Sequence, residues 1–253
     1  EASKDYILVM EYESLGCLRK NLHDIAKMGW KDKLNLLQCI TSDLQISHSH
    51  DLVHRDLHSG NILLNSLKSA YIADLGLSIT VNIELKSKSD GIYGILPYIA
   101  PEILNKQPYT KASDIYSFGI IMWEILYGKP VDFMQNSKLQ SKLQYQFQVC
   151  GGLRPPVYEN AVICYVDLMK KCWHTEPEKR PTANEVCEIF SEWQNNESIL
   201  LELSESYKKP QNIRNEDMQI NFDSLCKSNF ISFNSAYQGS HQVSLKIPDV
   251  IDE

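Results

Sequence analysis

One short stretch, HSHDLVHRDLHSGN (48–61), is crowded with side chains that bind metal ions or move protons. Imidazole and carboxylate groups are the usual ligands of zinc and other transition metals, so a metal site is one hypothesis. A carboxylate beside a nucleotide can instead accept a proton during group transfer, which is the second hypothesis. The side chains concerned are His48, His50, His54, His58, Asp51 and Asp56.

A zinc site would need three or four of these histidines to converge on one point. His48 and His50 lie two residues apart at the end of a predicted helix, so their side chains face different sides of it. His54 and His58 fall in irregular chain, where spacing alone supports no shared site. The spacing therefore favours helix-end or packing roles for most of the histidines over a metal site.

The segment HRDLHSGN (54–61) fits the pattern H-R-D-L-x-x-x-N of a phosphotransferase catalytic loop. Asp56 would accept the proton of an attacking hydroxyl, and the amide oxygen of Asn61 would hold Mg²⁺ against the phosphates. Asp74, in the sequence ADLGL, would be a second oxygen ligand. Because Mg²⁺ takes few protein oxygens beside phosphate and water oxygens, one Asn and one Asp are enough.

The elements around this loop are predicted from hydrophobic periodicity. Residues 30–48 carry apolar side chains at helical spacing, which predicts a helix with one buried face. Two short apolar runs, NILL (61–64) and AYIA (70–73), predict a small β-hairpin directly after the loop. The apolar positions of the helix are Trp30, Leu34, Leu37, Ile40 and Leu44.

Two more helices are indicated downstream. The run IYSFGIIMWEILY (115–127) is apolar on nearly every side, which predicts a helix at the centre of a domain, closed by Gly128. The sequence TANE (182–185) is a capping-box pattern that opens a helix running to about Trp193. The polar segment 78–90 predicts a surface loop.

Composition bounds the class of protein. The chain has 253 residues, 43% of them hydrophobic, and a net charge of −7, which argues against a nucleic-acid partner. No run approaches the roughly 18 apolar residues of a membrane span, and the first residues do not resemble a signal peptide. Seven cysteines without close pairing indicate reduced thiols. We therefore expect an intracellular, cytoplasmic monomer with no nucleic-acid or membrane partner.

Six motifs in order resemble the C-terminal lobe of a eukaryotic protein kinase, and most closely the tyrosine-kinase-like group of Ser/Thr kinases. The resemblance runs from Tyr6 to about Trp193 and implies a kinase-like α+β fold: a mainly α-helical C-lobe with a short catalytic-loop hairpin and a stub of the N-lobe. The motifs are LVMEY (fifth strand and hinge), HRDLHSGN (catalytic loop), ADLG (metal-binding turn), PYIAPE (end of the activation segment), SDIYSFG (central helix) and KKCWHTEPEKRPT (C-terminal subdomain).

The same resemblance divides the chain into three parts. Residues 1–13 would be the last N-lobe strand and the hinge, and residues 14–196 the C-lobe. Residues 197–253, rich in Asn, Ser, Gln, Lys and Asp, would form a largely disordered tail that can carry docking segments for a binding partner. The strand YILVMEY (6–12) stands without its sheet partners, so we expect the sequence to be a truncated form of a longer protein.

The resemblance also implies an ATP site. Met10 falls at the gatekeeper position, and the carbonyl of Glu11 and the amide of Glu13 would face the adenine edge. Leu63 would form the apolar floor under that ring. ATP and Mg²⁺ are the cofactors implied, and a protein is the substrate implied.

Several other positions receive structural roles from the resemblance. His54 would be a core histidine below the site, and Asp114 would tie the catalytic-loop backbone to the central helix. Glu102 and Arg180 would form a buried ion pair. Arg55 would pair with a phosphate on the activation segment, where the candidates are Ser87, Ser89 and Tyr93; the alternative is an unmodified, solvated loop.

Three positions depart from the family pattern. Leu75 stands where most kinases have Phe, and its apolar side chain is expected to keep the local packing. His58 replaces the Lys that touches the transferred phosphate in Ser/Thr kinases, which predicts a reduced rate. Ile95 replaces a Thr that bonds to the catalytic base, which blurs the preference between Ser/Thr and Tyr hydroxyls.

Two functions from different classes remain open. The first is an ATP- and Mg²⁺-dependent protein kinase acting on Ser/Thr hydroxyls, with Tyr as the open alternative. The second is a pseudokinase-like interaction scaffold without catalysis. The Gly-rich loop, the strand lysine and its partner glutamate are not among the 253 residues, so we expect this chain by itself to be inactive.

Overall fold

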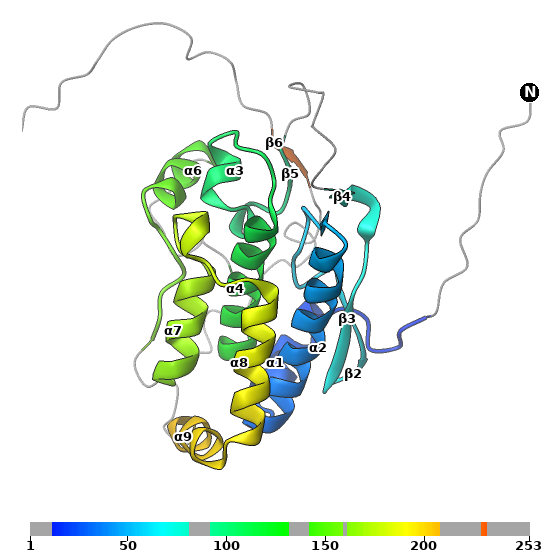
Figure 1. The fold of residues 1–253 in the computed structure, drawn as a ribbon, viewed down its shortest axis with the longest axis vertical. Helices are drawn as coiled ribbons and strands as arrows, with labels where there is room; N and C mark the ends of the chain where they lie inside the picture. The colour runs from blue at the N-terminus through cyan, green and yellow to red at the C-terminus, as the bar shows by residue number, and fades with distance from the viewer. Residues whose placement is uncertain (1–11, 81–91, 132–141, 159–160, 208–228, 232–253) are drawn as a thin grey trace, which may run out of the picture.

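The chain is mostly helical in the computed structural model, which describes residues 12–80, 92–131, 142–158, 161–207 and 229–231 (Figure 1). The helices are α1 (Leu18–Ala26), α2 (Trp30–Ser49), α3 (Pro101–Leu104), α4 (Lys111–Tyr127), α6 (Lys142–Cys150), α7 (Ile163–Cys172), α8 (Ala183–Asn195) and α9 (Glu197–Tyr207), with 3-10 turns η1 (Leu75–Leu77), η2 (Leu96–Tyr98) and η3 (Pro177–Lys179). The strands are β1 (Leu52–Val53), β2 (Ile62–Ser66), β3 (Ser69–Ile72), β4 (Ile79–Thr80), β5 (Ile92–Gly94) and β6 (Asn229–Ile231).

Helix α2 forms one wall of the hydrophobic core. Its buried positions recur every three or four residues, so one face of the helix points inward. That face packs against α8, while β3 lies along another side of the helix (Figure 1). The predicted helix over 30–48 is confirmed, and it ends one residue later at Ser49.

Helix α4 lies at the centre of the molecule, as its all-round apolar sequence predicted. Every residue from Ser113 to Tyr127 is buried. The helix starts at Lys111, after a capping box formed by Thr110 and Ser113. It ends at Gly128, where φ is +69° and a Cβ would lie 2.6 Å from the Cβ of Ala26 in α1, so both conformation and space favour glycine.

The strands form three separate antiparallel pairs, β1–β4, β2–β3 and β5–β6. The predicted hairpin after the HRDLHSGN loop is β2–β3, in which Leu63 lies opposite Tyr71. The capping box predicted from TANE is also present: Thr182 and Glu185 exchange side-chain and backbone hydrogen bonds at the start of α8.

The boundary of the predicted tail differs from the structure. We expected the tail to begin at residue 197, but residues Glu197–Tyr207 form helix α9, which packs against α8 and α2. The apolar side chain of Leu203 is fully buried in this contact, which supplies the reason for the added helix. Further along, residues 229–231 form strand β6 at the opposite end of the molecule from α9 (Figure 1).

Some sequence predictions lie outside the described residues. They include the strand at 6–12 up to residue 11, with Met10 and Glu11, and the phosphorylation candidates Ser87 and Ser89. Across the described ranges, no helix has both the length and the apolar character needed to cross a bilayer.

Candidate active site

Asp114 fixes the backbone of the loop that leads to Asp56. Its carboxylate is buried and accepts hydrogen bonds from the backbone N–H groups of His54 (2.8 Å) and Arg55 (3.1 Å). His48 Nε2 lies 3.0 Å from the same carboxylate. Because Asp114 belongs to α4 and His48 to α2, two packed helices hold this loop in place.

The loop then folds back so that Asn61 lies beside Asp56. Asn61 Nδ2 donates to the backbone oxygen of Asp56 over 3.0 Å, and Asn61 N donates to the oxygen of His58 over 2.9 Å. Asp56 N in turn donates to His54 Nδ1 over 3.3 Å. The Asp56 side chain is largely buried, with 7% of its surface exposed.

Strand β3 brings Asp74 to the same place. Ala73 N donates to the backbone oxygen of Asn61 over 2.8 Å, and His54 Nε2 donates to the oxygen of Ala73 over 3.0 Å. Asp74 follows directly, with φ at +60° and an exposed side chain that caps η1. The two predicted magnesium ligands therefore lie on segments joined by hydrogen bonds next to Asp56.

The donor set at this place suits a small divalent cation. Because Asn61 Nδ2 is engaged with the Asp56 backbone, the carboxamide oxygen faces away from it. Asp74 adds an exposed carboxylate. One amide oxygen and one carboxylate match the preference of Mg²⁺ for few protein oxygens, with phosphate and water oxygens completing the octahedron. The residues present therefore fit a magnesium–nucleotide complex.

The four histidines of the stretch do not converge. His48 contacts the Asp114 carboxylate, His54 the end of β3, and His50 is exposed, whereas His58 is buried beside Asp56. Over the part of the chain that the structure describes, no group of three His, Cys, Asp or Glu side chains is placed to hold a metal ion.

His58 lies under the base rather than out toward a phosphate. Its side chain is 3% exposed, its Nδ1 accepts a hydrogen bond from Gly60 N (3.0 Å), and its Nε2 lies 3.8 Å from Asp56 Oδ1. Burial, aided by the nearby positive charge of Arg19, lowers the pKa of His58 from 6.5 to about 3. The imidazole of His58 is therefore neutral at pH 7 and lies beside the Asp56 carboxylate.

The depressed pKa of His58 predicts that acid destabilises the fold. Between pH 6.5 and about 3 the unfolded chain binds a proton at His58 that the folded chain resists, so the free energy of unfolding falls as pH falls. One such group contributes up to about 1.4 kcal/mol per pH unit. Urea unfolding of the wild type and of His58→Gln at pH 7, 6 and 5 measures this slope. The exposed His50→Gln variant is the control, and equal slopes in wild type and His58→Gln would contradict the assignment.

The segment after the predicted hinge packs against β2. Cys17 forms an antiparallel bridge with Leu63, and Tyr71 Oη donates to Glu13 Oε1 over 3.1 Å. Leu63, the predicted floor of the adenine site, is partly exposed. Of the predicted adenine contacts, Glu13 and Leu63 are thus brought close to each other, and Met10 and Glu11 lie outside the described residues.

The family model for protein tyrosine and serine/threonine kinases matches residues 1–190. The chain belongs to the protein kinase family. The expected kinase C-lobe-like α+β fold is therefore confirmed: a mostly helical kinase lobe with a few short strands.

Proteins similar to this chain are named as protein kinases. It is 34% identical over 194 residues to a putative serine/threonine-protein kinase/receptor of Acanthamoeba polyphaga mimivirus, with 73% of this chain and 12% of that protein covered. It is 34% identical over 200 residues to a probable serine/threonine-protein kinase of Dictyostelium discoideum, covering 74% and 10%. It is 31% identical over 192 residues to a serine/threonine/tyrosine-protein kinase of Arabidopsis thaliana, covering 74% and 47%. The chain thus spans less than half the length of these relatives.

A buried polar cluster next to the HRDLHSGN loop was not predicted from the sequence. Tyr98 Oη donates to Glu124 Oε1 (2.6 Å), and Arg19 donates to Tyr98 Oη (2.9 Å) and to Ser59 Oγ (3.2 Å). Burial raises the pKa of Glu124, while the nearby Arg19 opposes this shift. The cluster joins α1, the catalytic loop, η2 and α4. The sequence did contain an indication of this cluster: Glu124 lies inside the apolar run IIMWEIL, and a buried carboxylate requires hydrogen-bond or charge partners.

Glu102 in α3 and Arg180, which follows η3, form a bidentate ion pair. Arg180 Nη1 and Nη2 each lie 2.7 Å from a different oxygen of Glu102. The Arg180 side chain is 0% exposed and that of Glu102 10%. The guanidinium also lies 5.2 Å from the ring centre of Tyr116. This geometry is the fork-to-fork pairing that guanidinium and carboxylate favour.

The guanidinium of Arg55, which was predicted to pair with a phosphate, lies over an aromatic ring. Its Cζ lies 4.7 Å from the ring centre of Tyr109. Its Nε is buried and has no hydrogen-bond partner among the described residues. Of the phosphate candidates, only Tyr93 falls in a described segment, where it contributes backbone to β5.

Ile95 and Leu75, two of the positions that depart from the family pattern, differ in burial. Ile95 is 7% exposed and belongs to the core. Leu75, which was expected to keep the packing of the aromatic residue it replaces, is 58% exposed. For the described part of the chain that expectation is wrong. Leu75 lies on the η1 turn at the surface, between Asp74 and Gly76, which are also exposed.

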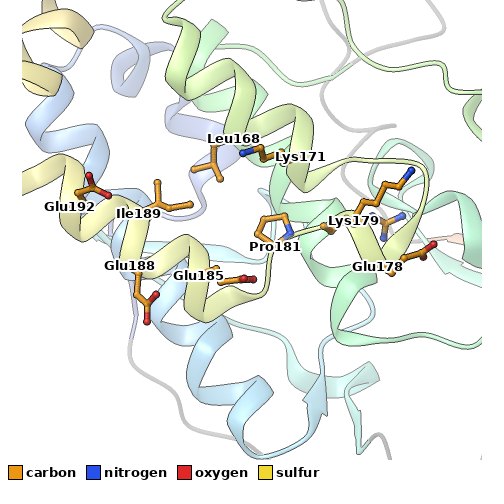
Figure 2. A pocket seen from close by; sticks show the side chains of 10 residues that line it. Leu168, Lys171, Glu178, Lys179, Pro181, Glu185, Glu188, Ile189 and Glu192 are labelled. Carbon is orange, nitrogen blue, oxygen red and sulfur yellow. The ribbon is translucent and has the colours of Figure 1, made fainter.

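A separate hollow of about 540 Å³ lies between α7, η3 and α8 (Figure 2). Figure 2 shows acidic and basic side chains around an apolar floor that contains Leu168, Pro181 and Ile189. Its lining does not include Asp56, Asn61 or Asp74, so it is not the site at which a nucleotide would react.

Proposed function

We propose that this protein kinase transfers the γ-phosphoryl group of ATP to Ser or Thr hydroxyls of protein substrates. The observation that carries the proposal is the hydrogen-bonded loop in which Asn61 and the residue before Asp74 are joined beside Asp56. The relatives named as serine/threonine kinases support the same reaction class. A bound magnesium–ATP complex would supply the transferable phosphoryl group and neutralise its developing charge.

Each residue of the site then has a defined task. Asp56 accepts the proton of the attacking hydroxyl, since its carboxylate is the acidic group at the end of the anchored loop. Asn61 and Asp74 present oxygens to the cation. His58, neutral and 3.8 Å from the Asp56 carboxylate, acts as a positioning residue for the base. Glu13 and Leu63 border the nucleotide, together with Met10 and Glu11.

For the acceptor hydroxyl we propose Ser/Thr over Tyr, because similar proteins are named serine/threonine kinases. His58 and Ile95 both replace residues typical of Ser/Thr kinases. One relative is named a serine/threonine/tyrosine kinase. Phosphoamino-acid analysis of the labelled product distinguishes the two preferences.

A second candidate function is a pseudokinase-like scaffold. It is favoured by His58, because a buried neutral imidazole cannot reach a phosphate in the way a lysine does. It is opposed by the three acidic and amide groups, Asp56, Asn61 and Asp74, which are all present in the order that phosphoryl transfer requires.

Removal of the metal tests the kinase proposal. The full-length gene product is incubated with labelled ATP and a generic protein acceptor, with Mg²⁺ and with excess EDTA. We expect label transfer that depends on Mg²⁺, because Asn61 and Asp74 would hold the phosphates through the cation. The 253-residue chain alone is the parallel sample and is expected to be inactive. Binding of labelled protein partners without any transfer by the full-length product would favour the scaffold.

We further propose that the C-lobe proper comprises residues 14–196, extended by the packed helix α9. The protein is proposed to act in the cytoplasm as a monomer, with protein substrates and with a partner for its C-terminal segment.

A further inference from the structure

A strand from the C-terminal segment pairs with the activation segment. Strand β6 (Asn229–Ile231) runs antiparallel to β5 (Ile92–Gly94), and the register places Asn229 opposite Gly94. The two strands are more than a hundred residues apart in the sequence, so this contact is not a local turn. The main chains of β5 and β6 make the pairing.

The β5 strand ends next to the predicted catalytic base. Gly94 has φ at +137°, and a Cβ built on it would lie 3.3 Å from Asp56 Oδ1. Neighbouring strands lie about 4.8 Å apart, so the backbone of Asn229 lies one strand spacing from Gly94. Strand β6 therefore pairs with the strand that ends beside the predicted catalytic base.

The edge of β5 is suited to an extended peptide. An unpaired strand edge offers a row of N–H and C=O groups, and added strands bind to such edges through main-chain hydrogen bonds. A three-residue pair is short, and two-stranded pairings of this kind are marginal in water. Because β6 is part of the same chain, its binding is intramolecular and does not depend on protein concentration.

We infer that the outer edge of β5 is a docking surface for extended peptides, and that residues 229–231 of this chain occupy it. One consequence rests on the proposed function: the bound strand competes with protein acceptors and so restrains the kinase. The short pairing explains how a better acceptor could displace it.

A double substitution removes the pairing without touching the site. Antiparallel pairing alternates along a strand, so of two consecutive residues in β6 one directs its N–H group to β5. Proline has no N–H group, and Phe230→Pro/Ile231→Pro therefore breaks the ladder whichever residue is the donor. Ser240→Pro/His241→Pro, further along the chain, is the matched control with the same number of added prolines.

The first measurement does not need catalysis. A fluorescent peptide of residues 225–235 is titrated into the full-length gene product and both variants, and amide hydrogen exchange of residues 92–94 is followed. We expect tighter peptide binding and faster exchange in Phe230→Pro/Ile231→Pro than in wild type, because the edge is vacated. Equal binding and equal exchange in the two proteins would overturn the inference, whether or not the protein is an active kinase.

The second measurement tests the restraint. In the active full-length kinase, Phe230→Pro/Ile231→Pro is expected to lower KM for a peptide acceptor at unchanged kcat, and the 225–235 peptide is expected to inhibit competitively against the acceptor. The control variant should match wild type. An unchanged KM in a variant whose 92–94 amides exchange faster would overturn the restraint. A protein with no transfer activity at all would contradict the proposed function and leave the docking result to stand on the first measurement.

Discussion

Replacing Arg180 with alanine is expected to lower the free energy of unfolding by about 3–5 kcal/mol, the range typical when one partner of a buried ion pair is removed. Arg180 and Glu102 are joined by two contacts of 2.7 Å, and both side chains are largely shielded from water. Without the guanidinium, the Glu102 carboxylate keeps its desolvation cost and loses its charge partner.

The loss extends beyond the ion pair. Arg180 also donates to the backbone oxygens of Ala112 (2.8 Å), His174 (2.8 Å) and Thr175 (3.3 Å). Through these bonds Arg180 links the first turn of α4 to the turn before η3. Each buried polar group left unsatisfied adds a further penalty. Arg180→Lys is not a rescue, because a single ammonium group cannot reproduce the fork geometry.

Urea unfolding of wild type and Arg180→Ala, monitored by far-UV circular dichroism, measures this effect. The matched control is Lys179→Ala, since Lys179 pairs with Glu176 at 2.8 Å but with both side chains more than half exposed. Exposed pairs contribute little to stability, so the control should unfold near wild type. If the urea midpoint of Arg180→Ala were as close to that of the wild type as the midpoint of Lys179→Ala is, the Arg180–Glu102 pair would not be stabilising.

Much of the fold was accessible from the sequence because it follows from local rules. The inward face of α2 came from apolar spacing, the central place of α4 from an apolar surface on all sides, and the start of α8 from the Thr182–Glu185 capping box. The order of Asp56, Asn61 and Asp74 likewise came from a motif whose spacing reflects chemistry.

What the sequence did not provide are contacts between residues far apart in the chain. Nothing local pairs Arg19 with Tyr98, or strand β6 with β5. Burial is also a tertiary property: His58 is buried, whereas Leu75, which was expected to keep the local packing, is exposed. Such differences arise because a side chain's environment depends on which distant elements cover it, which periodicity along one element does not report.

Replacing Asp56 with asparagine is expected to lower the rate of phosphoryl transfer by about 10²–10⁴-fold, the usual contribution of a positioned general base. The change keeps the size of the side chain and removes its ability to accept a proton. The loop should stay in place, because Asp114 holds it through the backbone of His54 and Arg55, and Asn61 bonds to the backbone oxygen of Asp56.

The matched control is Asp51→Asn, which makes the same chemical change on the same loop outside the site. Asp51 pairs with Lys111 at 2.6 Å on the partly exposed surface, so its replacement should leave the transfer rate near wild type. Initial rates with Mg-ATP and a generic acceptor are compared for the three full-length proteins, after circular dichroism has shown equal folding. A folded Asp56→Asn protein with the wild-type rate would mean that another group is the base or that a contaminating kinase supplies the activity.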